Sequence, residues 1–139
     1  MENGKWIMTE NNRGRGMSAE RKNVVAEKSL SFAVRVVKLY QHLVDKKREF
    51  VMSKQVLRSG TSIGANIREA TSAQSKADFI AKCCVALKEC DETGYWRELL
   101  SLTNFLSKTQ YESVETDRRE LFALLTAIIK TAKASLKHS

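Results

Sequence analysis

The chain has 139 residues, of which 42% are hydrophobic and 29% are charged, so it is long enough for one domain with a core and too apolar for disorder throughout. Its 24 basic and 16 acidic residues give a net charge of +8, which favours a polyanionic partner such as RNA, DNA or the acidic face of another protein. No apolar run approaches the roughly 20 residues that a membrane-spanning helix needs, and residues 1–20 lack the apolar stretch of a secretory signal, so we expect a cytoplasmic protein without a membrane partner.

Residues 1–20 are predicted to form a flexible N-terminal tail. Asparagines and glycines, among them Gly14 and Gly16, interrupt every apolar period in this stretch. Met17 directly precedes the first periodic segment and is an alternative start of the chain. The remaining residues, 21–139, are expected to form one domain.

Four segments of this domain repeat apolar residues every three or four positions, as amphipathic helices do. The predicted helices span residues 23–46, 53–73, 76–106 and 113–136. Because the connectors between them are short, we expect an all-α protein, an antiparallel up-down-up-down four-helix bundle. The alternative is a helical module that completes its core only in an oligomer.

Local signals place the ends and faces of these helices. Ser53 is predicted to cap the second helix, and Ser75 with Asp78 resembles a capping box at the start of the third. The pattern puts Arg97 on the polar side of the third helix and Glu115 on the exposed face of the fourth. Both charged residues are therefore expected to face solvent.

The second helix contains two glycines one turn apart, Gly60 and Gly64. Each costs about 1 kcal/mol relative to alanine inside a helix, which indicates close approach of a neighbouring backbone. If the second and third helices form a hairpin about position 74, Gly64 lies opposite the small side chains of Cys83 and Cys84.

The same hairpin predicts ion pairs between the two helices. It brings Arg58 within reach of Glu89, and Glu69 within reach of Lys82 or Lys76. The acidic residues of the third helix are expected to pair with neighbouring cations: Glu89 and Glu92 with Arg58, Lys82 and Lys88.

Residues that would carry chemistry are scarce. The cysteines at positions 83, 84 and 90 are odd in number and lack CxxC spacing, so we interpret them as small core hydrophobes. There are two histidines and no Glu-x-x-His motif, and the stretch SGTSIGAN lacks the lysine of a phosphate-binding loop. We therefore predict no enzyme activity, no metal site and no cofactor.

The basic residues are concentrated in residues 21–74, which hold eleven basic and four acidic side chains. Lysines and arginines contact phosphates without reading sequence. Base stacking would need exposed aromatic rings, and we expect Tyr40 and Trp96 to lie in the core. The candidate nucleic-acid contacts are Lys46, Lys47, Arg48, Lys54, Arg58 and Arg68.

The stretch SIGANIRE at residues 62–69 and the polar positions that follow it resemble the bacterial four helix bundle proteins, also called the 23S ribosomal RNA intervening-sequence proteins. The similarity covers roughly residues 27–100. The residues that carry it are Ser62, Asn66, Glu69, Asp78, Lys82, Glu89, Glu92 and Trp96. Arg97 departs from the family pattern, which often has leucine there, and Cys83 and Cys84 replace larger aliphatic residues.

The resemblance implies a homopentameric ring without enzyme activity. A related branch of the family is the accessory variability determinant of diversity-generating retroelements, a basic pentamer that binds RNA and a reverse transcriptase. The resemblance to this branch implies that the present chain has the same two partners. We therefore expect a non-catalytic oligomer that binds RNA through a basic surface without sequence preference. The alternative is a protein-interaction adaptor, such as an accessory protein of a retroelement reverse transcriptase.

Overall fold

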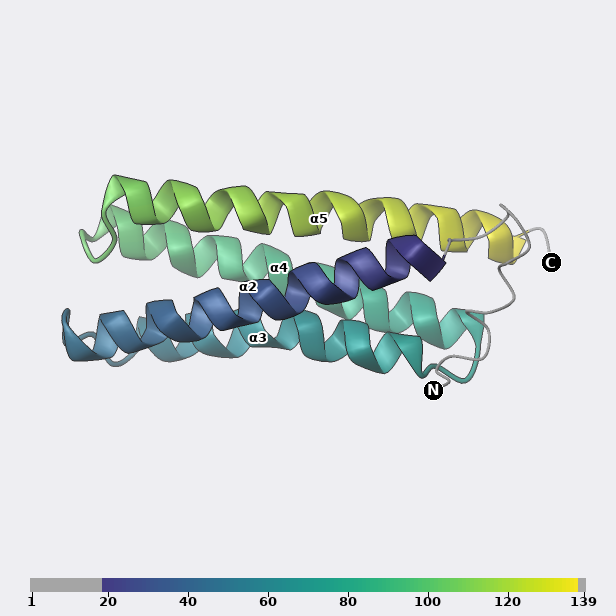
Figure 1. Cartoon of the computed structure of the whole chain (residues 1–139), viewed down its shortest axis with the longest axis horizontal. Helices are drawn as coiled ribbons and strands as arrows, with labels where there is room; N and C mark the ends of the chain where they lie inside the picture. The colour runs from purple at the N-terminus through teal and green to yellow at the C-terminus, as the bar shows by residue number, and fades with distance from the viewer. Residues whose placement is uncertain (1–18, 138–139) are drawn as a thin grey trace.

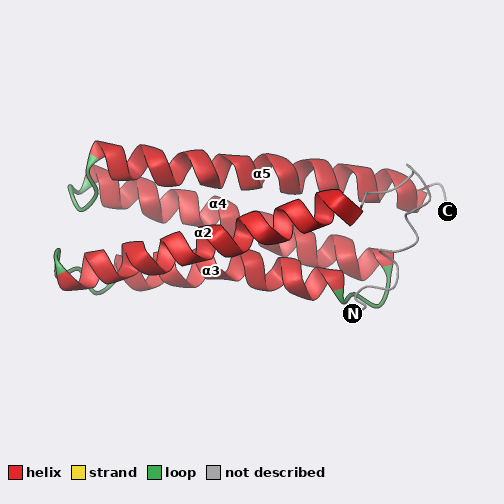
Figure 2. Cartoon of the chain, in the orientation of Figure 1, coloured by secondary structure: helices red, strands yellow, loops and turns green. Residues whose placement is uncertain are grey.

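Four helices account for nearly all of the residues that the computed structural model describes, 19–137. They are α2 (Ala19–Asp45), α3 (Met52–Thr71), α4 (Lys76–Leu102) and α5 (Lys108–Lys137), and short loops join them (Figure 1, Figure 2). Each helix packs against the next along the chain, and α2 also contacts α5, which closes the bundle. The predicted antiparallel four-helix bundle is confirmed. The predicted tail lies outside the described residues, apart from its last two positions, which start α2.

The apolar stripes predicted from spacing form the core. In α2 the side chains of Phe32, Val36, Leu39 and Leu43 are all buried. Cys83 and Cys90 of α4 are buried among them, as expected for small hydrophobes, and burial raises the pKa of their thiols to about 12 and about 11. The main apolar stripes of α2 and α4 are therefore buried as their sequence period predicts.

The glycines of α3 face α2, so the prediction that Gly64 meets α4 is wrong. A side chain at Gly60 would place its Cβ only 2.7 Å from Cγ2 of Val36, and one at Gly64 would lie 3.3 Å from Oγ of Ser29. The absence of side chains at these two positions lets α2 and α3 approach closely. Helix rotation, which spacing about the hairpin turn does not determine, decides which neighbour the glycines meet.

The helix ends differ from the predicted ones because side chains outside the periodic segments cap them. Ser53 is not the cap of α3; it is buried inside the first turn, and the carboxylate of Glu49 accepts its N–H at 2.6 Å. Ser75 caps α4 as predicted, accepting the N–H of Asp78 at 3.0 Å.

The connection between α4 and α5 is shorter than predicted. Helix α4 ends at Leu102, and α5 begins at Lys108, five residues before the predicted start. The hydroxyl of Ser107 accepts the N–H of Gln110 at 3.1 Å, and the side-chain oxygen of Gln110 accepts the N–H of Ser107 at 3.0 Å. This reciprocal capping box fixes the start of α5. In the described chain, no helix combines the length and apolarity that crossing a membrane requires.

Candidate nucleic-acid interface

The connector between α2 and α3, residues 46–51, forms a hydrogen-bonded turn. The N–H groups of Lys46 and Lys47 donate to the carbonyl of His42 at 2.9 and 3.3 Å, and the N–H of Glu49 donates to the carbonyl of Leu43 at 2.9 Å. Arg48 lies in the left-handed region with φ of 56°, a conformation that costs a non-glycine residue about 1 kcal/mol. The backbone hydrogen bonds of Lys47 and Glu49, on either side of Arg48, hold its backbone in this conformation.

Glu49 is the acidic residue at the centre of this connector, and it is only 8% exposed. Its carboxylate accepts the N–H groups of Val51, Met52 and Ser53 at 3.1, 3.0 and 2.6 Å. Burial by itself would raise the pKa of Glu49, but these backbone hydrogen bonds outweigh burial and lower the pKa. The negative charge is thus bound to the amino terminus of α3, where the helix dipole favours it.

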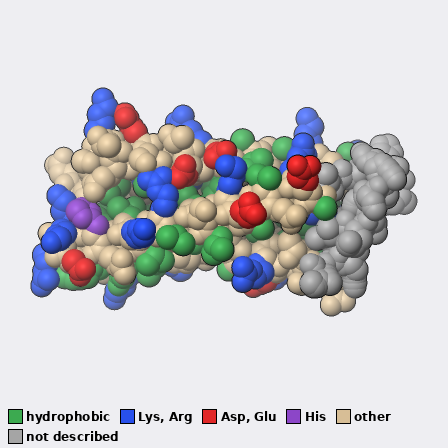
Figure 3. Space-filling view, viewed as in Figure 1, with side chains coloured by type: hydrophobic (Ala, Val, Ile, Leu, Met, Phe, Trp, Pro, Cys, Tyr) green, Lys and Arg blue, Asp and Glu red, His purple; other side chains and the backbone are tan. Residues whose placement is uncertain are grey.

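The four cations of the connector region point into solvent. Lys46, Lys47, Arg48 and Lys54 are exposed, and none of the ion pairs found in the described part of the chain includes them. Lysine and arginine side chains gather near a histidine at the end of the bundle where α2 meets α3 (Figure 3). These four exposed cations lie within nine residues along the chain and are named here the connector cluster.

Arg58, one turn further along α3 than Lys54, has a different environment. It forms ion pairs with Glu89, at 3.2 Å, and with Glu92 of α4, so the predicted pairing is confirmed. Trp96 donates its Nε1–H to the same Glu92 at 2.9 Å. The hydrogen bond from Arg58 lowers the pKa of Glu92. Two carboxylates therefore compensate the charge of Arg58, which sets it apart from the connector cluster.

The other predicted ion pair is also present. Nζ of Lys82 lies 2.9 Å from Oε1 of Glu69. The expected pairing of Lys82 and Lys88 with Glu89 or Glu92 is wrong, since no ion pair between residues 19 and 137 joins them. Arg58 lies nearer to these two carboxylates, because it extends from the facing turn of α3.

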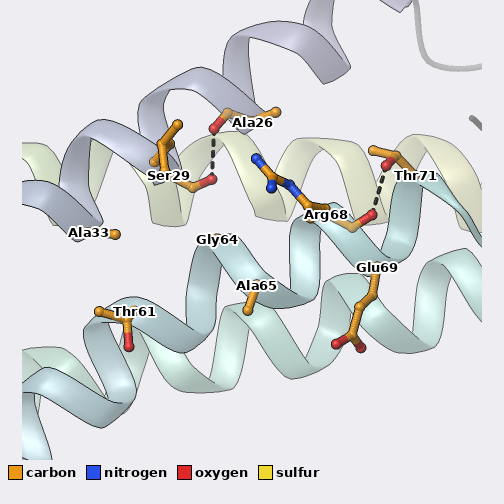
Figure 4. A pocket seen from close by; sticks show the side chains of 10 residues that line it. Ala26, Ser29, Ala33, Thr61, Gly64, Ala65, Arg68, Glu69 and Thr71 are labelled. Carbon is orange, nitrogen blue, oxygen red and sulfur yellow. Dashed lines mark hydrogen bonds between the residues drawn. The ribbon is translucent and has the colours of Figure 1, made fainter. Parts of the chain in front are cut away.

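Arg68 lies far from the connector cluster. It follows Lys54 by fourteen residues on α3, about 21 Å along the helix. It borders a groove of about 440 Å³ between α2 and α3 (Figure 4). Most of the residues that line the groove are small, and Leu30, Glu69 and Thr71 complete the lining with them: Ala26, Ser29, Ala33, Thr61, Gly64 and Ala65. The structure therefore divides the six predicted cations into the connector cluster, a paired Arg58 and a remote Arg68.

Two further family-motif residues, Ser62 and Asn66, bond within α3. The hydroxyl of Ser62 donates to the carbonyl of Arg58 at 2.7 Å, and Nδ2 of Asn66 donates to the carbonyl of Ser62 at 2.9 Å. Neither side chain bonds to α4, so their contribution is to the backbone of α3.

A buried ion-pair network that the sequence placed on the surface joins α4 to α5. Arg97 is 4% exposed and Glu115 is 8% exposed, so the prediction that both face solvent is wrong. Nε of Arg97 lies 2.9 Å from Oε1 of Glu115, without the alignment of a hydrogen bond. Nε of Arg118 and Nε of Arg119 each lie 2.7 Å from this carboxylate. Arg97 also lies over the ring of Tyr111, 3.8 Å from its centroid.

The spacing along α4 contains a signal for the burial of Arg97. This residue follows the buried Cys90 by seven positions and precedes the buried Leu100 by three, so it continues the apolar stripe. Burial by itself would raise the pKa of Glu115, but the hydrogen bonds from Arg118 and Arg119 outweigh it and lower the pKa to about 2. Among the side chains that the structure describes, no group of three histidine, cysteine or acidic residues is placed to hold a metal ion.

Comparisons with known proteins agree with this architecture. Residues 21–127 match the family described as 23S rRNA-intervening sequence protein. A crystal structure of a protein of unknown function from the S23 ribosomal protein family of Bacteroides thetaiotaomicron is 61% identical, with a TM-score of 0.79, and the match covers 79% of this chain and 98% of that chain. No curated protein matches. The resemblance carried by residues 62–69 is confirmed, and the chain belongs to the 23S rRNA-intervening sequence protein family.

Proposed function

We propose that this protein is a non-catalytic, oligomeric RNA-binding protein that contacts the phosphate backbone without reading sequence. The connector cluster carries this proposal. Four exposed cations lie within nine residues, and the acidic residue at their centre, Glu49, is buried with its carboxylate bound to the backbone of α3. Exposed cations attract phosphate groups. The carboxylate of Glu49 competes little with phosphates for these cations, because it is already bound to backbone N–H groups of α3.

The family supports RNA as the polyanion. Its description refers to the intervening sequence of 23S rRNA, and the similar crystal structure is assigned to a ribosomal protein family with unknown function. Neither description indicates a catalytic activity, which is consistent with a binding role.

We further propose that the protein assembles with copies of itself, as the homopentamer that the family resemblance implies. Leu30, Val34 and Val37 lie on one face of α2 and are 56%, 48% and 38% exposed. Leu30 also lines the small-residue groove between α2 and α3. A continuous exposed apolar stripe on a monomer favours a protein contact, and a second copy supplies the same stripe. Five copies would carry a formal charge of +40.

The decisive experiment compares two charge-reversed variants that change the net charge equally. One carries Lys46→Glu, Lys47→Glu and Arg48→Glu in the connector cluster. The control carries Lys130→Glu, Lys133→Glu and Lys137→Glu on exposed positions of α5, toward the opposite end of the bundle (Figure 1). Binding of a fluorescently labelled RNA is measured by anisotropy at several salt concentrations.

The connector variant is expected to bind RNA at least about tenfold more weakly, with a flatter dependence on salt, because each lost phosphate contact removes about 0.7–0.9 from the slope. The control is expected to remain close to the wild type. Equal losses in both variants would mean that net charge, not the connector cluster, attracts RNA. Wild-type affinity in a folded connector variant would exclude the cluster from the site. Native mass with and without nuclease tests the oligomer, and a nucleic-acid-free oligomer would favour the protein-adaptor alternative.

A further inference from the structure

An exposed aromatic ring lies inside the connector cluster. Phe50 is 46% exposed, and Cζ of Arg48 lies 5.4 Å from the centroid of its ring. The next residue, Val51, is 73% exposed. Packing into the core does not explain why a phenylalanine stands at position 50. The bundle buries Glu49 just before it and Ser53 three residues after it, whereas the ring of Phe50 remains exposed.

The turn holds this ring in place. The backbone before Phe50 is fixed by the hydrogen bond from Glu49 N–H to the carbonyl of Leu43. The backbone after it is fixed by the N–H groups of Val51 and Met52, which donate to the carboxylate of Glu49. Phe50 therefore lies between two anchored segments, and little backbone entropy is lost when a ligand binds to its ring.

We infer that Phe50 is a stacking platform for an unpaired base, and that single-stranded RNA is the preferred ligand of the connector cluster. This inference rests on the proposed RNA-binding function. An aromatic ring stacks on the face of any base, and an arginine beside it adds cation–π attraction. Lys46 and Lys47 of the same turn would contact the adjoining phosphates. Inside a duplex each base face is covered by its stacked neighbours, so apart from the two terminal pairs only an unpaired base can reach the ring.

Tyr95, the other strongly exposed aromatic residue between positions 19 and 137, lacks this setting. It is 58% exposed, but its ring packs edge-on against Trp96 with centroids 5.0 Å apart. Trp96 in turn donates to Glu92, so the surroundings of Tyr95 include a carboxylate. Tyr95 is a matched control: an exposed ring outside the connector cluster.

The test compares the full-length wild type with Phe50→Ala, Phe50→Trp and Tyr95→Ala. Each is titrated with a labelled 12-nucleotide single-stranded RNA and with a blunt RNA duplex at several salt concentrations. Phe50→Ala is expected to lose about tenfold in affinity for the single strand and little for the duplex. Its salt slope stays unchanged because no cation is removed. Phe50→Trp is expected to retain binding and to show quenching of the added tryptophan, and Tyr95→Ala is expected to match the wild type.

Equal binding of the single strand by Phe50→Ala and the wild type would overturn the stacking inference. The proposed function would still stand if the charge-reversed connector variant loses affinity in the same assay. A change in native mass of Phe50→Ala with no change in RNA affinity would also overturn the inference, and would assign Phe50 to a contact between copies. If the charge-reversed variant binds RNA as the wild type does, the proposed function fails.

Discussion

Arg97 of α4 and Glu115 of α5 form an ion pair inside the bundle, with 2.9 Å between Nε of Arg97 and Oε1 of Glu115. The two side chains are only 4% and 11% exposed. Arg118 and Arg119 donate to the same carboxylate, so three guanidinium groups converge on one acidic group. Removing the carboxylate would leave the charge of Arg97 buried without an anionic partner.

Glu115→Gln is therefore expected to destabilise the protein by about 3 kcal/mol, measured by urea unfolding. Arg97→Leu is expected to cost much less, because Arg118 and Arg119 still compensate Glu115 and because leucine suits a buried position. The exposed Glu112→Gln, one turn earlier, is the control and should change stability by less than about 0.5 kcal/mol. A smaller loss for Glu115→Gln than for Arg97→Leu would contradict the central role of the carboxylate.

The lowered pKa of Glu115 leads to a prediction of how the stability of the protein depends on pH. The pKa of Glu115 is lowered to about 2 in the folded protein, from an ordinary value of 4.5. A lowered pKa means that the unfolded chain binds the proton first, so the stabilisation is complete above about pH 5 and is lost as pH falls toward 2. The loss is about 3 kcal/mol in magnitude. Unfolding measured between pH 7 and pH 2 should show a weaker acid dependence in Glu115→Gln, and equal dependence in both proteins would refute the assignment.

Gly60→Ala tests the close approach of α2 and α3. The added Cβ would lie 2.7 Å from Cγ2 of Val36, a stiff β-branched side chain that is 1% exposed. We expect overpacking of about 1–3 kcal/mol to exceed the gain of about 1 kcal/mol in helix propensity, so thermal stability falls.

Gly64→Ala is the matched control for this substitution, since its nearest contact would be Oγ of Ser29 at 3.3 Å. It should be tolerated better than Gly60→Ala. Combining Gly60→Ala with Val36→Ala should relieve the steric part of the loss, so the double variant should be less destabilised than the sum of the two single variants. Strict additivity would argue against direct contact.

Glu49→Ala tests whether the connector is held by its cap. The substitution removes the acceptor of three backbone N–H groups and is expected to cost about 2 kcal/mol. It should also weaken RNA binding despite the gain of one unit of positive charge, because the connector cluster loses its fixed geometry. The control is Asp45→Ala, an exposed residue at the end of α2, which adds the same charge. If both variants bind RNA more tightly, the cluster acts through charge alone.

The fold was predictable because its signals are local and periodic. Stripes such as Phe32, Val36, Leu39 and Leu43 repeat with the period of a helix, and the short connectors leave an antiparallel arrangement. The predicted ends were less accurate. Glu49 and the Ser107–Gln110 capping box set the starts of α3 and α5 from positions outside the apolar pattern.

The sequence by itself determined the number of helices, the main apolar stripe that each one buries, and the hairpin pairs Arg58–Glu89 and Glu69–Lys82. These depend on spacing along one helix or across one turn. Only the tertiary structure decided that Gly60 meets Val36 and that Arg97 and Glu115 are buried together. These contacts depend on the rotation of each helix against its neighbours, which the spacing of residues along one helix does not set.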